Sequence, residues 1–164
     1  LQQSLDLRRQ IFSAPDDRIA HSHSALSMLA SRQRDDKSAI EHAQASLTMR
    51  EALFTDPHPG LVIARLQLSA AHHAARDFEA ARTLAERAAS NCAMPNFSHP
   101  YCARTQIALA RIALDRGELQ PAARHAERAR DDAIAMFGDH GVEVGRPFLV
   151  LGEIATRRGD QHEA

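Results

Sequence analysis

Apolar and polar residues are mixed along the chain in long segments rich in Ala, Leu, Arg, Glu and Gln. These residues are good helix formers, so each segment predicts a helix. Seven prolines and seven glycines cluster at intervals and separate the segments. The strongest β-branched patch, Leu61-Val62-Ile63, leads directly into a helical pattern. We therefore expect an all-α protein.

The helical segments form an internal repeat, which decides the architecture of such a chain. Four short turns each end on an alanine, at positions 39, 81, 122 and 164, so the steps are 42, 41 and 42 residues. A leucine lies thirteen residues before each alanine: Leu26, Leu68, Leu109 and Leu151. An ordinary bundle with alanine-rich seams does not explain this fixed step.

Each repeat predicts two helices. The first, helix A, is expected at 17–33, 59–75, 100–116 and 142–158. The second, helix B, is expected at 36–54, 78–94 and 119–137. An acidic residue lies where each helix B begins, complementing the helix dipole: Asp35, Asp77, Glu118 and Asp160.

The repeat alanines have a physical role in packing the predicted helices. Two antiparallel helices approach closely only where one of them presents a small side chain at the crossing. We therefore expect Ala39, Ala81 and Ala122 to accept the buried leucines of helix A. Stacked helix pairs of this kind predict a right-handed α-solenoid.

The repeats divide the chain into a single array. Its parts are a partial helix B, three repeats and a partial fourth repeat: 1–14, 15–56, 57–97, 98–138 and 139–164. Ser4–Phe12 aligns with Ser46–Phe54 at an offset of 42 residues, which identifies the partial helix. We expect both ends to be half-units of a longer repeat protein, with unpaired faces open to self-association.

These features resemble the tetratricopeptide repeat (TPR), in the long form found in kinesin light chain and in many bacterial repeat proteins. That form has a His-Pro loop, a leucine-containing helix A, a turn glycine and alanines along helix B. The loop and the turn glycine are matched at four places: His58-Pro59, His99-Pro100, Gly117 and Gly159. The chain departs from the pattern at Arg34 and Arg76, which replace the turn glycine, and the aromatic turn position is aromatic only at Phe78.

The resemblance implies a non-catalytic scaffold whose helix A residues line a concave groove for a peptide or a partner protein. The repeat register places ten residues at partner-binding positions: Met28, Leu66, Gln67, His73, Arg104, Ile107, Arg111, Arg146, Leu149 and Glu153. One repeat position is expected to form an apolar ladder: Leu66, Ile107 and Leu149. The later repeats carry a basic cluster: Arg104, Arg111 and Arg146. The competing interpretation is that packing buries the ladder and that solvent covers the arginines.

Such a groove favours an extended or helical peptide that carries both apolar and acidic residues, because guanidinium groups pair with carboxylates. The alternative function is a regulatory or sensor arm of a larger bacterial signalling enzyme, such as a serine/threonine kinase or a transcriptional regulator. The sequence that flanks this chain would separate the two functions.

Composition and charge exclude several other classes of protein. Twenty basic and 21 acidic residues among 164 give a net charge of -1, which argues against nucleic-acid and membrane-surface binding. No apolar run approaches the roughly 18 residues of a membrane-spanning helix, and no signal-peptide pattern opens the chain. The only two cysteines, Cys92 and Cys102, are expected to be reduced thiols in a cytoplasmic protein.

Ten histidines raise the question of a metal site. His21 and His23 would diverge by about 200° around a helix, and no His-Glu-x-x-His signature is present. His58 and His99 recur before proline in loops, which favours a structural or capping role. No phosphate-binding loop or nucleophile elbow occurs either, so we expect neither a metal, a cofactor nor a catalytic residue.

Overall fold

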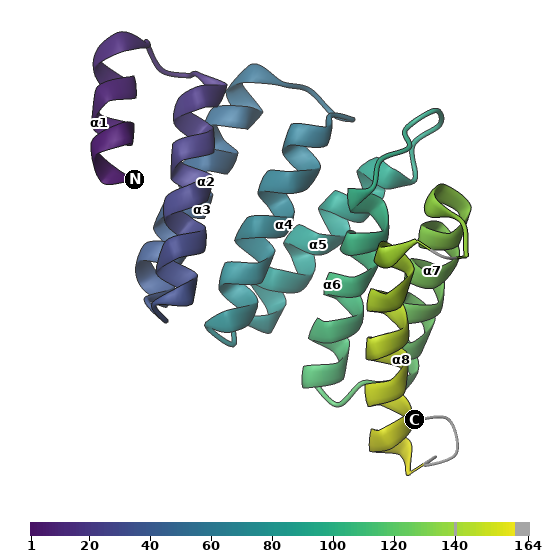
Figure 1. Ribbon diagram of the computed structural model, residues 1–164. Helices are drawn as coiled ribbons and strands as arrows, with labels where there is room; N and C mark the ends of the chain where they lie inside the picture. The colour runs from purple at the N-terminus through teal and green to yellow at the C-terminus, as the bar shows by residue number, and fades with distance from the viewer. Residues whose placement is uncertain (140, 160–164) are drawn as a thin grey trace. The chain divides into compact units, whose positions relative to one another are not determined.

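A computed structural model describes residues 1–139 and 141–159 (Figure 1). Over these residues it contains helices and no strand. The elements are α1 (Gln2–Ile11), α2 (Asp17–Arg32), α3 (Asp36–Leu53), α4 (Pro59–Ala74), α5 (Phe78–Cys92), α6 (Tyr101–Asp115), α7 (Leu119–Phe137), the 3-10 helix η1 (Val142–Val144) and α8 (Gly145–Arg158). The predicted all-α class and helix pairs are confirmed. The predicted start of the fourth helix A, residue 142, forms η1 rather than α-helix.

The chain divides into two compact units, which we describe separately. Unit 1 is Leu1–Met94 and unit 2 is Pro95–Ala164. In unit 1, α2 pairs with α3 and α4 with α5, while α3 packs on α4 and α1 on α2. In unit 2, α6 pairs with α7, and α8 packs on both, with η1 between α7 and α8. Helix A residues therefore lie on α2 and α4 in unit 1, and on α6 and α8 in unit 2.

The leucine and alanine columns form the core, as the repeat predicts. Leu26, Leu68 and Leu109 are buried, whereas Leu151 is half-buried against the core of unit 2. The alanines of the helix B column are almost fully enclosed: Ala39, Ala43, Ala81, Ala85, Ala122 and Ala126. Ala164 lies outside the described residues. Small side chains at the crossings thus allow close packing of the pairs.

The turn between helix A and helix B has a left-handed residue in every repeat. Arg34 and Arg76 adopt φ of 60° and 61°, and Gly117 and Gly159 adopt 79° and 82°. Glycine takes this conformation without a steric penalty, whereas a residue with a Cβ atom does not. The two arginines therefore form the same turn as the glycines, at a cost in backbone strain.

The helix starts use the capping side chains that the sequence indicates. Asp35 and Asp77 accept hydrogen bonds from the backbone N–H groups of Ser38 and Ala80. Glu118 makes no such cap and instead accepts a bond from Arg116 Nε at 2.7 Å, and Asp160 lies outside the described residues.

The two loop histidines also cap helices. His58 Nδ1 accepts a bond from Gly60 N at 3.1 Å, and His99 Nδ1 accepts one from Tyr101 N at 3.2 Å. The ring of His58 additionally stacks on Phe54, with centroids 3.8 Å apart. The predicted structural role of these histidines is confirmed.

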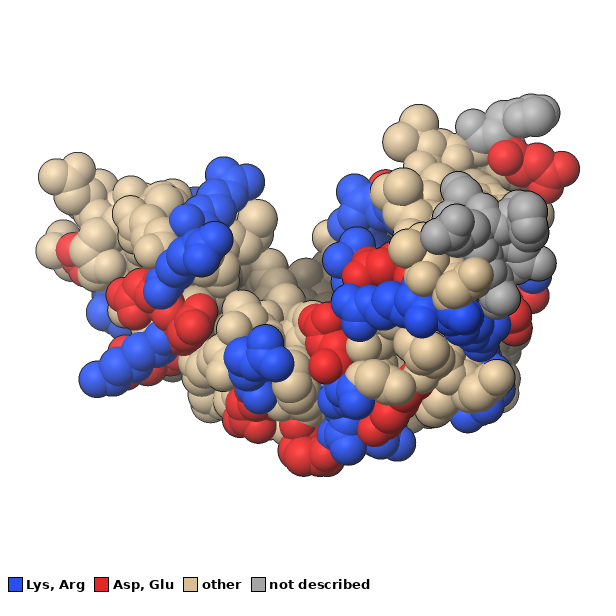
Figure 2. All heavy atoms as spheres, turned by 90° about the horizontal axis from the view of Figure 1, so that it is seen from below, with Lys and Arg blue, Asp and Glu red and all other residues tan. Residues whose placement is uncertain are grey.

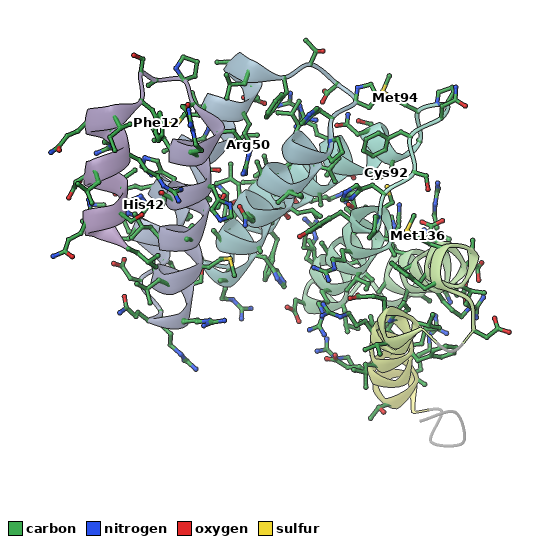
Figure 3. All side chains as sticks on the ribbon, turned by 45° about the horizontal axis from the view of Figure 1, so that its top comes forward. Phe12, His42, Arg50, Cys92, Met94 and Met136 are labelled. Atoms are coloured by element: carbon green, nitrogen blue, oxygen red, sulfur yellow. The ribbon has the colours of Figure 1, made fainter. Side chains whose placement is uncertain are left out.

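Unit 1 buries charged side chains between its helices. Arg65 on α4, only 2% exposed, donates two bonds to the carboxylate of Asp56 and one to Asn91 on α5, at 2.8–3.0 Å. Arg50 on α3, labelled in Figure 3, donates to Asp17 and to a buried pair of serines on α2 and α3. The guanidinium of Arg65 holds the pKa of Asp56 below its ordinary value. These bonds connect neighbouring helices, which apolar contacts alone would otherwise hold together.

A chain of three nitrogen-bearing side chains joins α1, α2 and α3. Arg9 lies 3.2 Å from His23 Nε2, and His23 Nδ1 lies 3.0 Å from His42 Nδ1. Because arginine only donates, His23 Nε2 must accept and its Nδ1 must carry the proton that His42 accepts. Burial, then the neighbouring His42 and Arg9, lower the pKa of His23 to about 4. His23 is therefore neutral in this arrangement.

Candidate functional site

The predicted partner-binding residues lie on two helix A faces. The unit 1 face is formed by α2 and α4, and the unit 2 face by α6, η1 and α8. Charged side chains of both signs are interspersed on the side of the molecule shown in Figure 2. The chemistry of the two faces differs, so each is described in turn.

The predicted positions of the unit 1 face contain no Lys, Arg, Asp or Glu. Met28 on α2 is exposed, while Leu66 and Gln67 on α4 are half-buried. Gln67 Nε2 lies 3.9 Å from the sulfur of Met28, so these two side chains bridge the helices. His73 is half-buried, and its ring lies 5.7 Å from that of Phe78. The four predicted residues of this face therefore offer apolar, amide and imidazole surface.

The unit 2 face is built around a network of three charged residues, in which one glutamate pairs with two arginines. Arg104 on α6 donates from a terminal nitrogen to Glu143 Oε1 at 3.0 Å. Arg146 on α8 places Nε 3.3 Å from Glu143 Oε2. The guanidinium of Arg104 also lies 4.9 Å from the centroid of the Tyr101 ring, within the range of a cation–π interaction. One carboxylate therefore joins two arginines from neighbouring helices.

The remaining charged residues of the unit 2 face are more dispersed. Arg111 is exposed near the far end of α6, and Glu153 accepts a bond from Arg157 at 2.8 Å. Of the predicted basic cluster, Arg104 and Arg146 are thus brought together by Glu143, whereas Arg111 is not part of that ion pair.

The predicted apolar ladder is divided between the units. Leu66 lies in unit 1, and Ile107 and Leu149 lie in unit 2. Ile107 is half-buried and packs against the core, whereas Leu149 is 71% exposed. Val142, seven residues before Leu149, is 92% exposed. Packing thus buries part of the Ile107 side chain and leaves the Leu149 side chain exposed.

Three residues of the unit 2 face were not predicted from the sequence: Tyr101, Val142 and Glu143. Tyr101 and Glu143 each precede one of the arginines by three residues, a spacing that places side chains together on a helix. Val142 lies in the 3-10 helix η1, outside α8, and only its exposure identifies it. Local spacing could therefore have identified Tyr101 and Glu143.

Side chains that bind metals do not cluster in the part of the chain that the structure describes. No group of three His, Cys, Asp or Glu side chains within residues 1–139 and 141–159 could hold a metal ion. Nor does any helix within those ranges have the length and apolar character needed to cross a membrane.

The cysteines differ from the prediction. Cys92 and Cys102 are both disulfide-bonded, so the expectation of two reduced thiols is wrong. That expectation rested on the small number of cysteines, which indicates a class of protein but not the oxidation state of a particular thiol.

Comparison with known proteins places the fold. No protein-family model matches the chain, and no curated protein matches its sequence. A solved structure of nearly identical TPR-like repeats, from a Podosopora anserina protein named as a kinesin light chain, is 17% identical with a TM-score of 0.77. The aligned region covers 99% of this chain and 77% of the chain in that structure. The solved structure of BtubC (BKLC) from P. vanneervenii is 17% identical with a TM-score of 0.85. Its aligned region covers 99% of this chain and 66% of the BtubC chain.

These similarities confirm the predicted fold: the chain is a TPR-like helical repeat protein in its architecture. Folds of this kind present extended surfaces built from successive repeats and generally mediate contacts between proteins. They are usually non-catalytic.

Proposed function

We propose that this chain is a non-catalytic scaffold that binds a peptide or a partner protein on its helix A faces. The observation that carries the proposal is the exposure of Leu149, at 71%, on the same helix face as Arg146. Large apolar side chains beside a charged group that can orient a ligand are typical of binding surfaces.

The unit 2 face favours a ligand of mixed chemistry. Burial of apolar ligand side chains against Leu149 would supply most of the affinity, at roughly 25 cal/mol per Å² before the costs of binding. The guanidinium groups of Arg104 and Arg146 would orient acidic side chains, because arginine pairs bidentately with carboxylate. The expected ligand is therefore an extended or helical peptide with apolar and acidic residues.

A peptide library tests this proposal. The library is screened against the wild type, an Arg104→Glu/Arg146→Glu variant, and an Arg124→Glu/Arg128→Glu variant. Arg124 and Arg128 are exposed on α7, so the last variant carries the same change in net charge away from the helix A face. Circular dichroism confirms that all three proteins are folded.

We expect the wild type and the α7 control to select apolar peptides enriched in acidic residues. The Arg104→Glu/Arg146→Glu variant should lose the acidic enrichment while it keeps the apolar preference. Salt should weaken binding moderately without abolishing it, since exposed charges are screened. Selection of the same peptides by all three proteins would contradict the proposed role of the unit 2 face.

A further inference from the structure

We infer that Glu143 is an internal competitor for the acidic group of the ligand on the unit 2 face, and that it selects ligands with one acidic side chain over ligands with two neighbouring ones. The inference rests on the proposed function. Glu143 belongs to η1, which precedes α8 in the chain, and its carboxylate bridges α6 and α8.

The geometry of the ion pair resembles the contact that a ligand carboxylate would make. Each oxygen of Glu143 faces a different arginine, at 3.0 Å from Arg104 and 3.3 Å from Arg146. A ligand carboxylate between the same two guanidinium groups would need the space that Glu143 fills. Both carboxylates cannot occupy it together, so binding there requires that Glu143 leaves.

The contacts of Glu143 allow it to leave. Its side chain is 31% exposed and those of Arg104 and Arg146 are 37% and 55% exposed, so water can replace each bond. Ion pairs that are this accessible contribute little to stability. The anchor of η1 is instead Val144, which is buried in an apolar cluster with Ala103 and Ala133. Release of the carboxylate therefore leaves the backbone of η1 in place.

Arg104 remains ordered when the carboxylate leaves, because a second group holds it. The ring of Tyr101 lies 4.9 Å from the guanidinium, and this contact does not depend on Glu143. An arginine that is held in place loses less side-chain entropy when a ligand binds.

Charge counting determines the selectivity. Two arginines share one carboxylate, so the group retains one positive charge. Glu143 stays attached to the chain when a ligand displaces its carboxylate, so its charge still counts. A ligand with a single acidic side chain therefore neutralises the group, whereas a ligand with two adjacent acidic side chains leaves it with one negative charge. Glu143 thus penalises doubly acidic ligands more than singly acidic ones.

The test measures binding of three labelled peptides by fluorescence anisotropy. The peptides are Ac-Leu-Leu-Glu-Glu-Leu-Leu and two relatives in which glutamine replaces one or both glutamates. The proteins are the wild type, Glu143→Gln, Glu86→Gln and Arg104→Gln/Arg146→Gln. Glu86 is the matched control, because it is an exposed glutamate that pairs with an arginine, Arg82, but lies on the helix B α5 of unit 1. Thermal unfolding establishes that each variant is folded.

We expect Glu143→Gln to bind the singly acidic peptide about threefold to fivefold more tightly than the wild type, the range of an exposed ion pair. Its gain for the doubly acidic peptide should be larger, and binding of the uncharged peptide should not change. Glu86→Gln should behave as the wild type does.

Two outcomes would overturn the inference and differ in what they say of the proposed function. If Glu143→Gln fails to tighten binding while Arg104→Gln/Arg146→Gln weakens binding of the acidic peptides, Glu143 only positions the arginines and the proposed function stands. If no protein prefers the acidic peptides over the uncharged one, the acidic ligand class is also wrong.

Discussion

The two units build the same repeat with different interiors. Unit 1 buries Arg50, Arg65 and His23 among its apolar residues, whereas the helix pair of unit 2 closes around alanine, with Thr105 and Gln106 as its buried polar side chains in the described residues. Both interiors keep the leucine and alanine columns. The repeat therefore depends on those columns and tolerates buried polar groups wherever neighbouring helices supply their partners.

One repeat position shows how the polar partners are arranged. His23, Arg65 and Gln106 lie 42 and 41 residues apart in α2, α4 and α6. His23 contacts His42 at 3.0 Å, and Gln106 contacts His125 at 2.8 Å, nineteen residues later in both cases. In the middle repeat Leu84 replaces this histidine, and Arg65 bonds to Asp56 and Asn91 instead. The polar residue at this position of α2, α4 and α6 thus finds a partner in each helix pair, but not the same one.

The largest expected effect is the loss of the buried arginine in unit 1. Arg65→Ala removes two bonds to the exposed Asp56 and leaves the buried Asn91 without its donor. The change should cost about 3–4 kcal/mol of unfolding free energy, because each bond to a charged group contributes about 1.5–3 kcal/mol. Gln106→Ala at the same repeat position of unit 2 removes a neutral bond and should cost about 1–2 kcal/mol. Urea unfolding monitored by circular dichroism measures both. Equal losses of unfolding free energy would mean that the charged bonds of Arg65 stabilise unit 1 no more than the neutral bond of Gln106 stabilises unit 2.

A pH effect of about 3 kcal/mol should distinguish His23. Its pKa is lowered from 6.5 to about 4 in the folded chain, so the unfolded chain binds the proton more readily. The contribution of His23 to stability is therefore present above pH 6.5 and is lost as the pH falls to 4, by at most about 3 kcal/mol. Unfolding by urea at pH 7 and pH 4 measures the loss.

His23→Gln is the control for this titration, because glutamine occupies the equivalent position 106 and contacts a histidine there. Carboxylates such as Asp56 titrate in both proteins, so the difference between the two proteins isolates His23. We expect the loss of stability on acidification to be smaller in His23→Gln. Identical pH profiles would show that the Arg9–His23–His42 chain does not depend on a neutral His23.

The alanine columns should respond alike in the two units, with losses of about 1–3 kcal/mol. Ala81→Leu in unit 1 and Ala122→Leu in unit 2 each force a larger side chain into a site with no exposed surface. Ala135→Leu, at an exposed position of α7, is the control and should change stability by less than about 0.5 kcal/mol. Thermal unfolding provides the measurement. A clearly smaller loss at Ala81 would indicate that the polar interior of unit 1 is the more deformable one.

The sequence predicted the elements more completely than the site. The columns of Leu68 and Ala81 determined the helix pairs, because spacing along one chain constrains packing directly. The position of Leu149 on the helix A face followed from the same register, but its exposure depends on what surrounds it. Contacts such as Arg104–Glu143 and His23–His42 join side chains from different elements, so no local pattern determines which partner each one takes.

The turns provide the smallest expected effect and the most direct comparison of the units. Arg34 in unit 1 and Gly117 in unit 2 occupy the same left-handed position, with φ of 60° and 79°. Arg34→Gly relieves the strain of the Cβ atom but increases the entropy of the unfolded chain, so we expect a net gain of about 0.5 kcal/mol. Gly117→Ala meets no atom within 4 Å, so its loss of about 1 kcal/mol would report the backbone conformation alone. Urea unfolding of the two variants measures both changes. A loss of stability in Arg34→Gly would show that the arginine side chain stabilises its turn by more than the left-handed conformation costs.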